Sequence, residues 1–277
     1  MLHVGQHTRL LISRINATGA FLTTDEGEVL LPGRFIPAGA EPGAAIDVFI
    51  YCDSEDRLVA TTQTPKAVVG EFALLRVKDT HETIGAFLDW GLDKDLLLPF
   101  AEQNSPVSAG DLVLVRLYLD QSGRIAASAR VDKHLRPADN ALAVGDQVRL
   151  MAYASTDLGI KVIINNRYDG LLFHNELYST PARGQSLKGY VRKIRNDGKI
   201  DVTLRKGGAQ EAEDDREVIL AALTTRDGFL PLTDKSAPED IAEVLGLSKK
   251  SFKKAVGGLY KEGLITMKVD GLRLRTR

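Results

Sequence analysis

The sequence predicts a mainly β, multidomain protein, with three tandem five-stranded barrels followed by a smaller α+β domain. Two observations predict this fold class. A pattern of short strands occurs three times along the 277 residues, at intervals of about 65 to 75 residues. From about residue 212 onwards, the alternation typical of strands gives way to helical periodicity.

Each repeat is built from the same series of short segments. A Val-Gly pair comes first, and a glycine that begins an alternating strand follows about fifteen residues later. The pairs are Val4-Gly5, Val69-Gly70 and Val144-Gly145, and the strands begin at Gly19, Gly85 and Gly159. An apolar run, another apolar strand and a polar turn with a last strand complete five strands. We expect each unit to close into an OB-fold barrel, because closure removes exposed strand edges. The expected domains are residues 1–64, 65–135 and 141–207.

Residues 212–277 indicate a winged-helix domain. Apolar residues between Val218 and Leu223 mark a first helix, Pro238 suits the first turn of a second, and Ser248 is expected to cap a third. The buried stripe of the third helix is expected to be Phe252, Ala255, Val256 and Leu259. Asp270-Gly271 predicts a two-residue hairpin turn. Three helices followed by a hairpin form a helix-turn-helix with a β-wing.

The net charge of −1 hides a separation of charge along the chain. Residues 1–64 carry 4 basic and 8 acidic side chains, whereas residues 134–207 carry 12 basic and 7 acidic ones. Residues 249–277 carry 9 basic and only 2 acidic side chains. A polyanion would therefore be repelled by the front of the chain and attracted to the third repeat and the tail.

The repeats resemble the S1-type RNA-binding domain, and several segments resemble the conserved virulence factor B family more closely. The segments are Asp53 to Thr61, Gly85 to Gly91 (GAFLDWG), Lys94 to Leu97 and Ser248 to Ala255. The resemblance covers nearly the whole chain. It implies three barrels, a C-terminal winged helix, RNA binding and a role in post-transcriptional gene regulation.

The resemblance also suggests where RNA bases would contact the barrels. S1-type domains use the aromatic of Gly-x-Phe, which is Phe21 or Phe87 here but Lys161 in the third unit. They also use a residue after the apolar run, which is proline in two units and Phe173 in the third. Phe21 and Phe87 are weaker candidates, and a place in the barrel core is an equal alternative for both.

The third barrel combines aromatic and basic residues, as single-strand-binding barrels do. Its candidate RNA-binding residues are Lys161, Phe173, His174, Tyr190, Arg192, Lys193, Arg195, Lys199 and Arg205. The winged helix adds Lys249, Lys250, Lys253, Lys254, Lys261, Arg273 and Arg275 as phosphate-binding candidates. A solvated helix face and a charged terminus are the alternative interpretation of this second set.

The sequence offers no catalytic residues, and neither a metal nor a cofactor is expected. Its five histidines are scattered, and Cys52 is the only cysteine. The acidic residues Asp53, Glu55 and Asp56 could hold Mg²⁺, but acids in such a position commonly shape turns. We find no secretory signal or membrane-length apolar run, and a single cysteine fits the reducing cytoplasm.

The leading hypothesis is a non-catalytic protein that binds single-stranded RNA through the third barrel and the winged helix, with ribosome association as one setting. One alternative is a DNA-binding transcription regulator that uses the winged helix. Its third helix offers mainly lysines, which suit phosphates better than base edges. Another alternative is a scaffold whose acidic front barrels dock a ribosomal or other basic protein.

Overall fold

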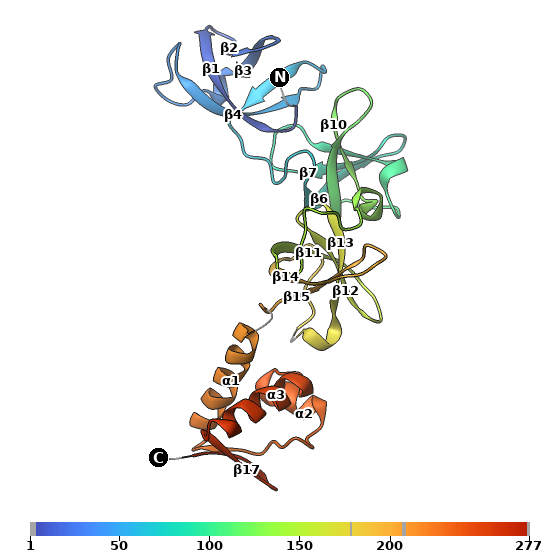
Figure 1. Ribbon diagram of the computed structural model, residues 1–277. Coiled ribbons are helices and arrows are strands. Elements are labelled where there is room, and N and C mark those ends of the chain that lie inside the picture. Colours follow the sequence, from blue (N-terminus) through green and yellow to red (C-terminus); the bar gives the residue numbers. More distant parts are fainter. Residues whose placement is uncertain (1–3, 178, 207–208, 276–277) are drawn as a thin grey trace. The chain divides into compact units, whose positions relative to one another are not determined.

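The computed structural model describes residues 4–177, 179–206 and 209–275 (Figure 1). It contains three closed five-stranded barrels and a C-terminal domain with three α-helices and a three-stranded sheet. The fold class predicted from the sequence is therefore confirmed. The chain divides into two compact units, Met1–Leu135 and Arg136–Arg277.

The first unit holds two barrels of the same topology. The strands of the first barrel are β1 (His7–Ile15), β2 (Gly19–Thr24), β3 (Gly27–Pro32), β4 (Ala45–Cys52) and β5 (Leu58–Thr61). Those of the second are β6 (Phe72–His81), β7 (Gly85–Asp89), β8 (Leu96–Pro99), β9 (Leu112–Leu119) and β10 (Ile125–Ser128). In both barrels the first strand pairs with the second and the fourth, and the fifth strand lies between the third and the fourth. This is the order of an OB-fold barrel.

The second unit begins with a barrel of the same order. Its strands are β11 (Gln147–Ser155), β12 (Gly159–Ile164), β13 (Tyr168–Phe173), β14 (Ser186–Ile194) and β15 (Ile200–Thr203). In all three barrels a short 3₁₀ helix follows the third strand: η1 (Gly33–Phe35), η2 (Phe100–Glu102) and η4 (His174–Glu176). A fourth, η3 (Val131–His134), follows β10.

Steric crowding explains why a glycine begins the second strand of each barrel. A Cβ atom at Gly19, Gly85 or Gly159 would lie 2.2 Å from a carbonyl oxygen of the neighbouring third strand. No side chain fits at that distance, so the two strands pair this closely only where glycine stands. The feature that revealed the repeat is therefore a requirement of close pairing between the second and third strands.

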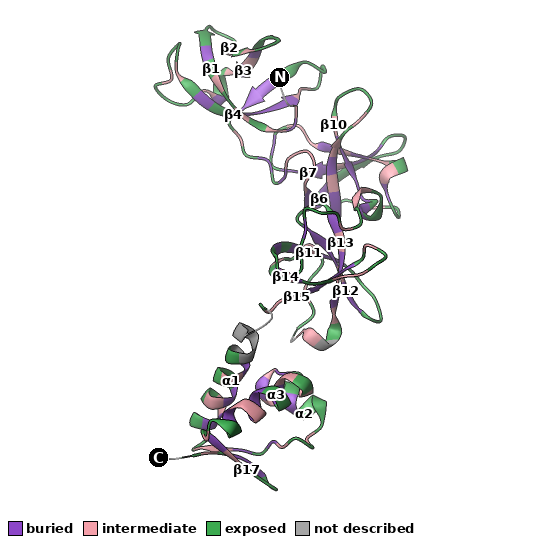
Figure 2. Cartoon of the chain, viewed as in Figure 1, coloured by how far each residue is buried: buried purple, intermediate pink, exposed green. Residues whose placement is uncertain are grey.

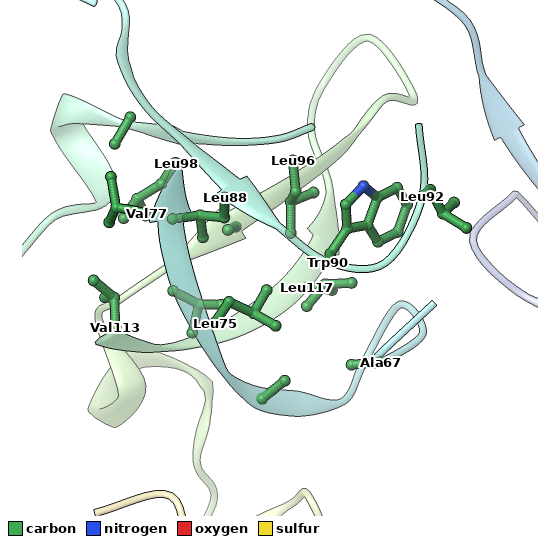
Figure 3. Packing of buried hydrophobic residues seen from close by; sticks show 14 of the residues in the cluster. Ala67, Leu75, Val77, Leu88, Trp90, Leu92, Leu96, Leu98, Val113 and Leu117 are labelled. Carbon is green, nitrogen blue, oxygen red and sulfur yellow. The ribbon is translucent and has the colours of Figure 1, made fainter. Parts of the chain in front are cut away.

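The first two barrels share part of one core. Figure 3 shows Trp90 packed among the buried leucines of the second barrel. Its ring lies edge-on to Phe49 of β4 in the first barrel, with centroids 5.7 Å apart. Lys94 also donates hydrogen bonds to the carbonyl oxygens of Cys52 and Asp53, at 3.0 and 2.7 Å. Trp90 is therefore a structural residue at the boundary between the first two barrels.

The C-terminal domain has the predicted winged-helix elements. Its helices are α1 (Ala209–Thr224), α2 (Pro238–Leu245) and α3 (Lys249–Lys261), and its sheet has the order β16 (Phe229–Leu230), β18 (Gly271–Leu274), β17 (Ile265–Lys268). Ser248 caps α3, since its hydroxyl oxygen accepts a hydrogen bond from the backbone N–H of Ser251 at 3.1 Å. The apolar stripe of α3 is buried as expected. In Figure 2, where buried residues are purple and exposed ones green, α3 carries both colours.

The hairpin turn differs from the prediction by one residue. Lys268 pairs with Gly271, so the two turn residues are Val269 and Asp270 rather than Asp270 and Gly271. Gly271 has a different role: a Cβ there would lie 2.2 Å from the carbonyl oxygen of Leu230 on β16. The glycine therefore permits close pairing of β16 with β18.

Within the described part of the chain, no helix is long and apolar enough to cross a membrane.

Candidate nucleic-acid interface

One edge of the third barrel carries a shallow hollow of about 310 Å³. Phe173 at the end of β13 lines it together with Arg192 and Lys193 of β14 and Asp201 of β15. The guanidinium of Arg195 lies 5.9 Å from the centre of the Phe173 ring. The barrel thus brings a half-buried aromatic ring together with three of the predicted basic residues.

Most cations of the third barrel are already paired with carboxylates. Arg192 forms an ion pair with Glu176 of η4. Arg195 pairs with Asp201 at 2.7 Å, Lys199 with Asp197 at 3.3 Å and Lys161 with Asp169 at 3.7 Å. Among the residues lining the hollow, Lys193 makes no ion pair within the described part of the chain. The formal excess of basic residues therefore overstates the positive charge available to a ligand.

Other predicted residues of this barrel lie away from the hollow. The Lys161 ammonium lies 5.0 Å from the centre of the Tyr153 ring. Tyr190 is half-buried on β14, opposite Gln147 and Thr203. The two residues do not line the hollow that contains Phe173.

His174 and Arg205 hold neighbouring segments in place. His174 places Nε2 2.8 Å from the carbonyl oxygen of Thr156, in the loop between β11 and β12. Arg205 pairs with Asp215 of α1 at 2.5 Å and donates to the carbonyl oxygen of Gly246 at 3.1 Å. Because the Asp215 side chain is almost fully buried, its charge needs a partner, and the Arg205 guanidinium supplies one. Arg205 therefore has a structural role.

The lysines of α3 form a separate cationic surface. Lys250, Lys253, Lys254 and Lys261 are exposed, on the side opposite the buried stripe that runs from Phe252 to Leu259. Lys249, at the start of the helix, is half-buried. Within the described residues these lysines make no ion pair, in contrast to most cations of the third barrel. Their positive charge is available to an anionic ligand.

The wing contributes less free charge than the sequence suggested. Arg273 pairs with Asp270 at 2.8 Å, and its guanidinium lies 4.5 Å from the centre of the Phe229 ring. Arg275 is exposed next to β18. Of the two predicted wing arginines, Arg275 is therefore the better placed for a phosphate.

In the first barrel, the predicted aromatic residue is covered. The Arg14 guanidinium lies 3.6 Å from the centre of the Phe21 ring, and Glu28 holds that guanidinium at 2.7 Å. A base could stack on this face of Phe21 only after Arg14 moved away.

The Asp53 turn of the same barrel is held by its own carboxylate, which accepts hydrogen bonds from the backbone N–H groups of Glu55 and Arg57.

The second barrel exposes an aromatic residue that the sequence interpretation missed. Phe100 in η2 is 51% exposed, next to Ile84, which is 44% exposed. The backbone N–H of Phe100 donates to the carbonyl oxygen of Ile84, as that of His174 donates to Leu158 in the third barrel. Phe100 therefore occupies the position of His174, one residue beyond the proline that the family pattern singled out. The predicted Phe87 is half-buried on β7.

Three OB-type barrels, a winged helix and the exposed lysines of α3 define a multidomain nucleic-acid-binding protein. The family model of the S1 domain matches residues 4–63 and 69–130, and that of the CvfB-like winged helix domain matches residues 217–274.

The chain is also similar to whole proteins. It is 31% identical over 277 residues to the uncharacterized protein YitL of Bacillus subtilis, covering 94% of this chain and 90% of that protein. It is 27% identical over 242 residues to conserved virulence factor B of Staphylococcus epidermidis, covering 84% and 81%. A solved multidomain protein with nucleic acid binding domains from Streptococcus pneumoniae is 28% identical, with 98% of each chain covered and a TM-score of 0.42. The chain belongs to the family of YitL and conserved virulence factor B.

Proposed function

We propose that this chain is a non-catalytic RNA-binding protein that holds single-stranded RNA on α3 and on the Phe173 edge of the third barrel. The observation that carries the proposal is the row of four exposed lysines on α3, which are free of ion pairs within the described residues. Lysines in such a row bind successive phosphates and gain affinity from the release of counterions.

Two features favour single strands over duplex DNA. The exposed face of α3 carries lysines rather than the Asn, Gln or Arg side chains that read base edges in a major groove. Phe173, bordered by cations, offers a ring on which an unpaired base can stack. A role in post-transcriptional or translation-linked regulation in the cytoplasm suits such binding, and the chain's membership of the conserved virulence factor B family supports it.

Fluorescence polarisation with a labelled single-stranded RNA tests the proposal. The full chain should bind this RNA more tightly than a duplex DNA of the same sequence, and the affinity should fall as salt rises. The Lys250→Ala/Lys253→Ala variant should bind more weakly, and so should Phe173→Ala. If no RNA binds at low salt, the proposal is wrong. A preference for duplex DNA would instead support a transcription regulator.

A second candidate function is a protein scaffold, which the exposed Phe100 and Ile84 on the acidic second barrel favour. An exposed apolar pair on a barrel with a small excess of acidic residues suits a basic partner such as a ribosomal protein. Pull-down with and without nuclease separates the two functions. A partner that survives nuclease treatment and is lost in Phe100→Ala supports the scaffold.

A further inference from the structure

Helix α3 contains two adjacent glycines in its interior, Gly257 and Gly258. Glycine inside a helix is less favourable than alanine, because the unfolded chain loses more conformational freedom on folding. Neither glycine has a positive φ. A Cβ at Gly258 would make an ordinary contact with the Arg216 side chain at 3.8 Å, and a Cβ at Gly257 would meet no heavy atom within 4 Å. The fold itself therefore requires neither glycine.

Gly257 lies in the middle of the lysine surface. At about 100° per residue, Lys253, Lys254 and Lys261 fall within about 60° of its direction around the helix axis. Lys253 and Lys254 precede it by four and three residues, and Lys261 follows by four, which are the spacings of direct neighbours on a helix surface. Gly257 is thus a bare stretch of main chain with three lysines around it.

We propose that one backbone phosphate of the bound nucleic acid sits at Gly257, directly against the α3 main chain, where Lys253, Lys254 and Lys261 converge on it. Without a Cβ, the phosphate approaches the helix about 1.5 Å more closely, the length of one carbon–carbon bond. The three ammonium groups then reach it from different sides, and no carboxylate among the described residues competes for them. This site rests on the proposed RNA-binding function and names the contact at its centre.

The substitution Gly257→Ala in the full chain tests the proposal, because its expected effects on stability and binding have opposite signs. All three α-helices that the structure describes lie in the winged-helix domain, so circular dichroism at 222 nm follows the melting of that domain. The melting temperature should rise by about 4 to 8 °C, since alanine favours the helix. The affinity for single-stranded RNA should nevertheless fall about tenfold, as expected for one weakened charge-assisted contact. The salt slope should decrease by about 0.7, the contribution of one phosphate.

Gly258→Ala is the matched control, because its new methyl group would point towards Arg216 on α1. It should raise the melting temperature by a similar amount and leave RNA binding unchanged. Unchanged binding by Gly257→Ala would overturn the proposal, and so would a fall in its melting temperature, since the fold would then need the glycine. If the wild-type chain binds no RNA, the proposed function itself fails. A third outcome separates the two ideas. If the wild type binds RNA, Lys250→Ala/Lys253→Ala does not, and Gly257→Ala binds as well as the wild type, then the RNA-binding function stands and only the phosphate site at Gly257 is refuted.

Discussion

The unpaired lysines of α3 lead to a quantitative prediction about salt. The triple variant Lys250→Ala/Lys253→Ala/Lys254→Ala removes three exposed cations that no described carboxylate neutralises. Each phosphate neutralised on a single strand contributes about 0.7 to the slope of log affinity against log salt concentration, so the slope should fall by about 2. The ratio of wild-type affinity to variant affinity should therefore fall about 20-fold between 50 and 200 mM salt.

A matched variant in the third barrel separates free charge from paired charge. This variant replaces three cations with alanine: Arg192, Arg195 and Lys199. In the structure each of them forms an ion pair with a carboxylate. A phosphate must displace that carboxylate, so fewer counterions are released per contact, and alanine at all three positions should lower the slope by less than about 1.

The assay is fluorescence polarisation of one labelled RNA at five salt concentrations, with far-ultraviolet circular dichroism to check that each variant is folded. Equal losses of slope in the two triple variants would refute the reasoning, because paired and unpaired cations would then contribute alike. An unchanged slope in the α3 variant would remove α3 from the interface.

Three further predictions concern the core, the effect of pH and base stacking. Phe49→Ala should destabilise the first unit by about 3–5 kcal/mol, the usual loss for a fully buried phenylalanine. With a urea slope of about 2 kcal/mol/M, the unfolding midpoint seen by Trp90 fluorescence should fall by about 2 M, and an unchanged midpoint would contradict the shared core. Burial, assisted by the Arg116 guanidinium 3.2 Å from Nδ1, holds the pKa of His134 below its ordinary value of 6.5. The folded state therefore binds this proton less readily than the unfolded state, and the free energy of unfolding should fall as pH drops below about 6.5. Urea titrations should show a larger fall in the wild type than in His134→Gln, and an identical pH dependence would exclude His134 as a cause. Phe173→Ala should weaken RNA binding by about 1–3 kcal/mol if a base stacks there, and an unchanged dissociation constant in the polarisation assay would show that none does.

The barrels were predictable from the sequence because their determinants are local. The strand alternation and the glycines at positions 19, 85 and 159 lie within each repeat, and one steric requirement explains all three glycines. The hairpin turn was displaced by one residue, because the role of Gly271 depends on β16, which is distant in sequence. A local turn signal and a non-local close approach both select glycine.

The candidate site was less predictable because its properties depend on contacts between strands. Counting charges gave the third barrel a positive excess, but the ion pair of Arg195 with Asp201 depends on how β14 and β15 pair. The covering of Phe21 by Arg14 likewise depends on the register of β1 and β2. Phe100 could have been found from the sequence by aligning it with His174, since both follow the apolar run at the same distance.

The packing of Trp90 against Phe49 also bears on how this architecture can be inherited. Three similar repeats suggest three interchangeable modules, yet Phe49 would lose its cover if the chain were cut between the first two barrels. A single-barrel fragment would expose an aromatic surface and tend to aggregate. Recombination should therefore retain the first two barrels as a pair, so the smallest heritable module of the front half is two repeats long.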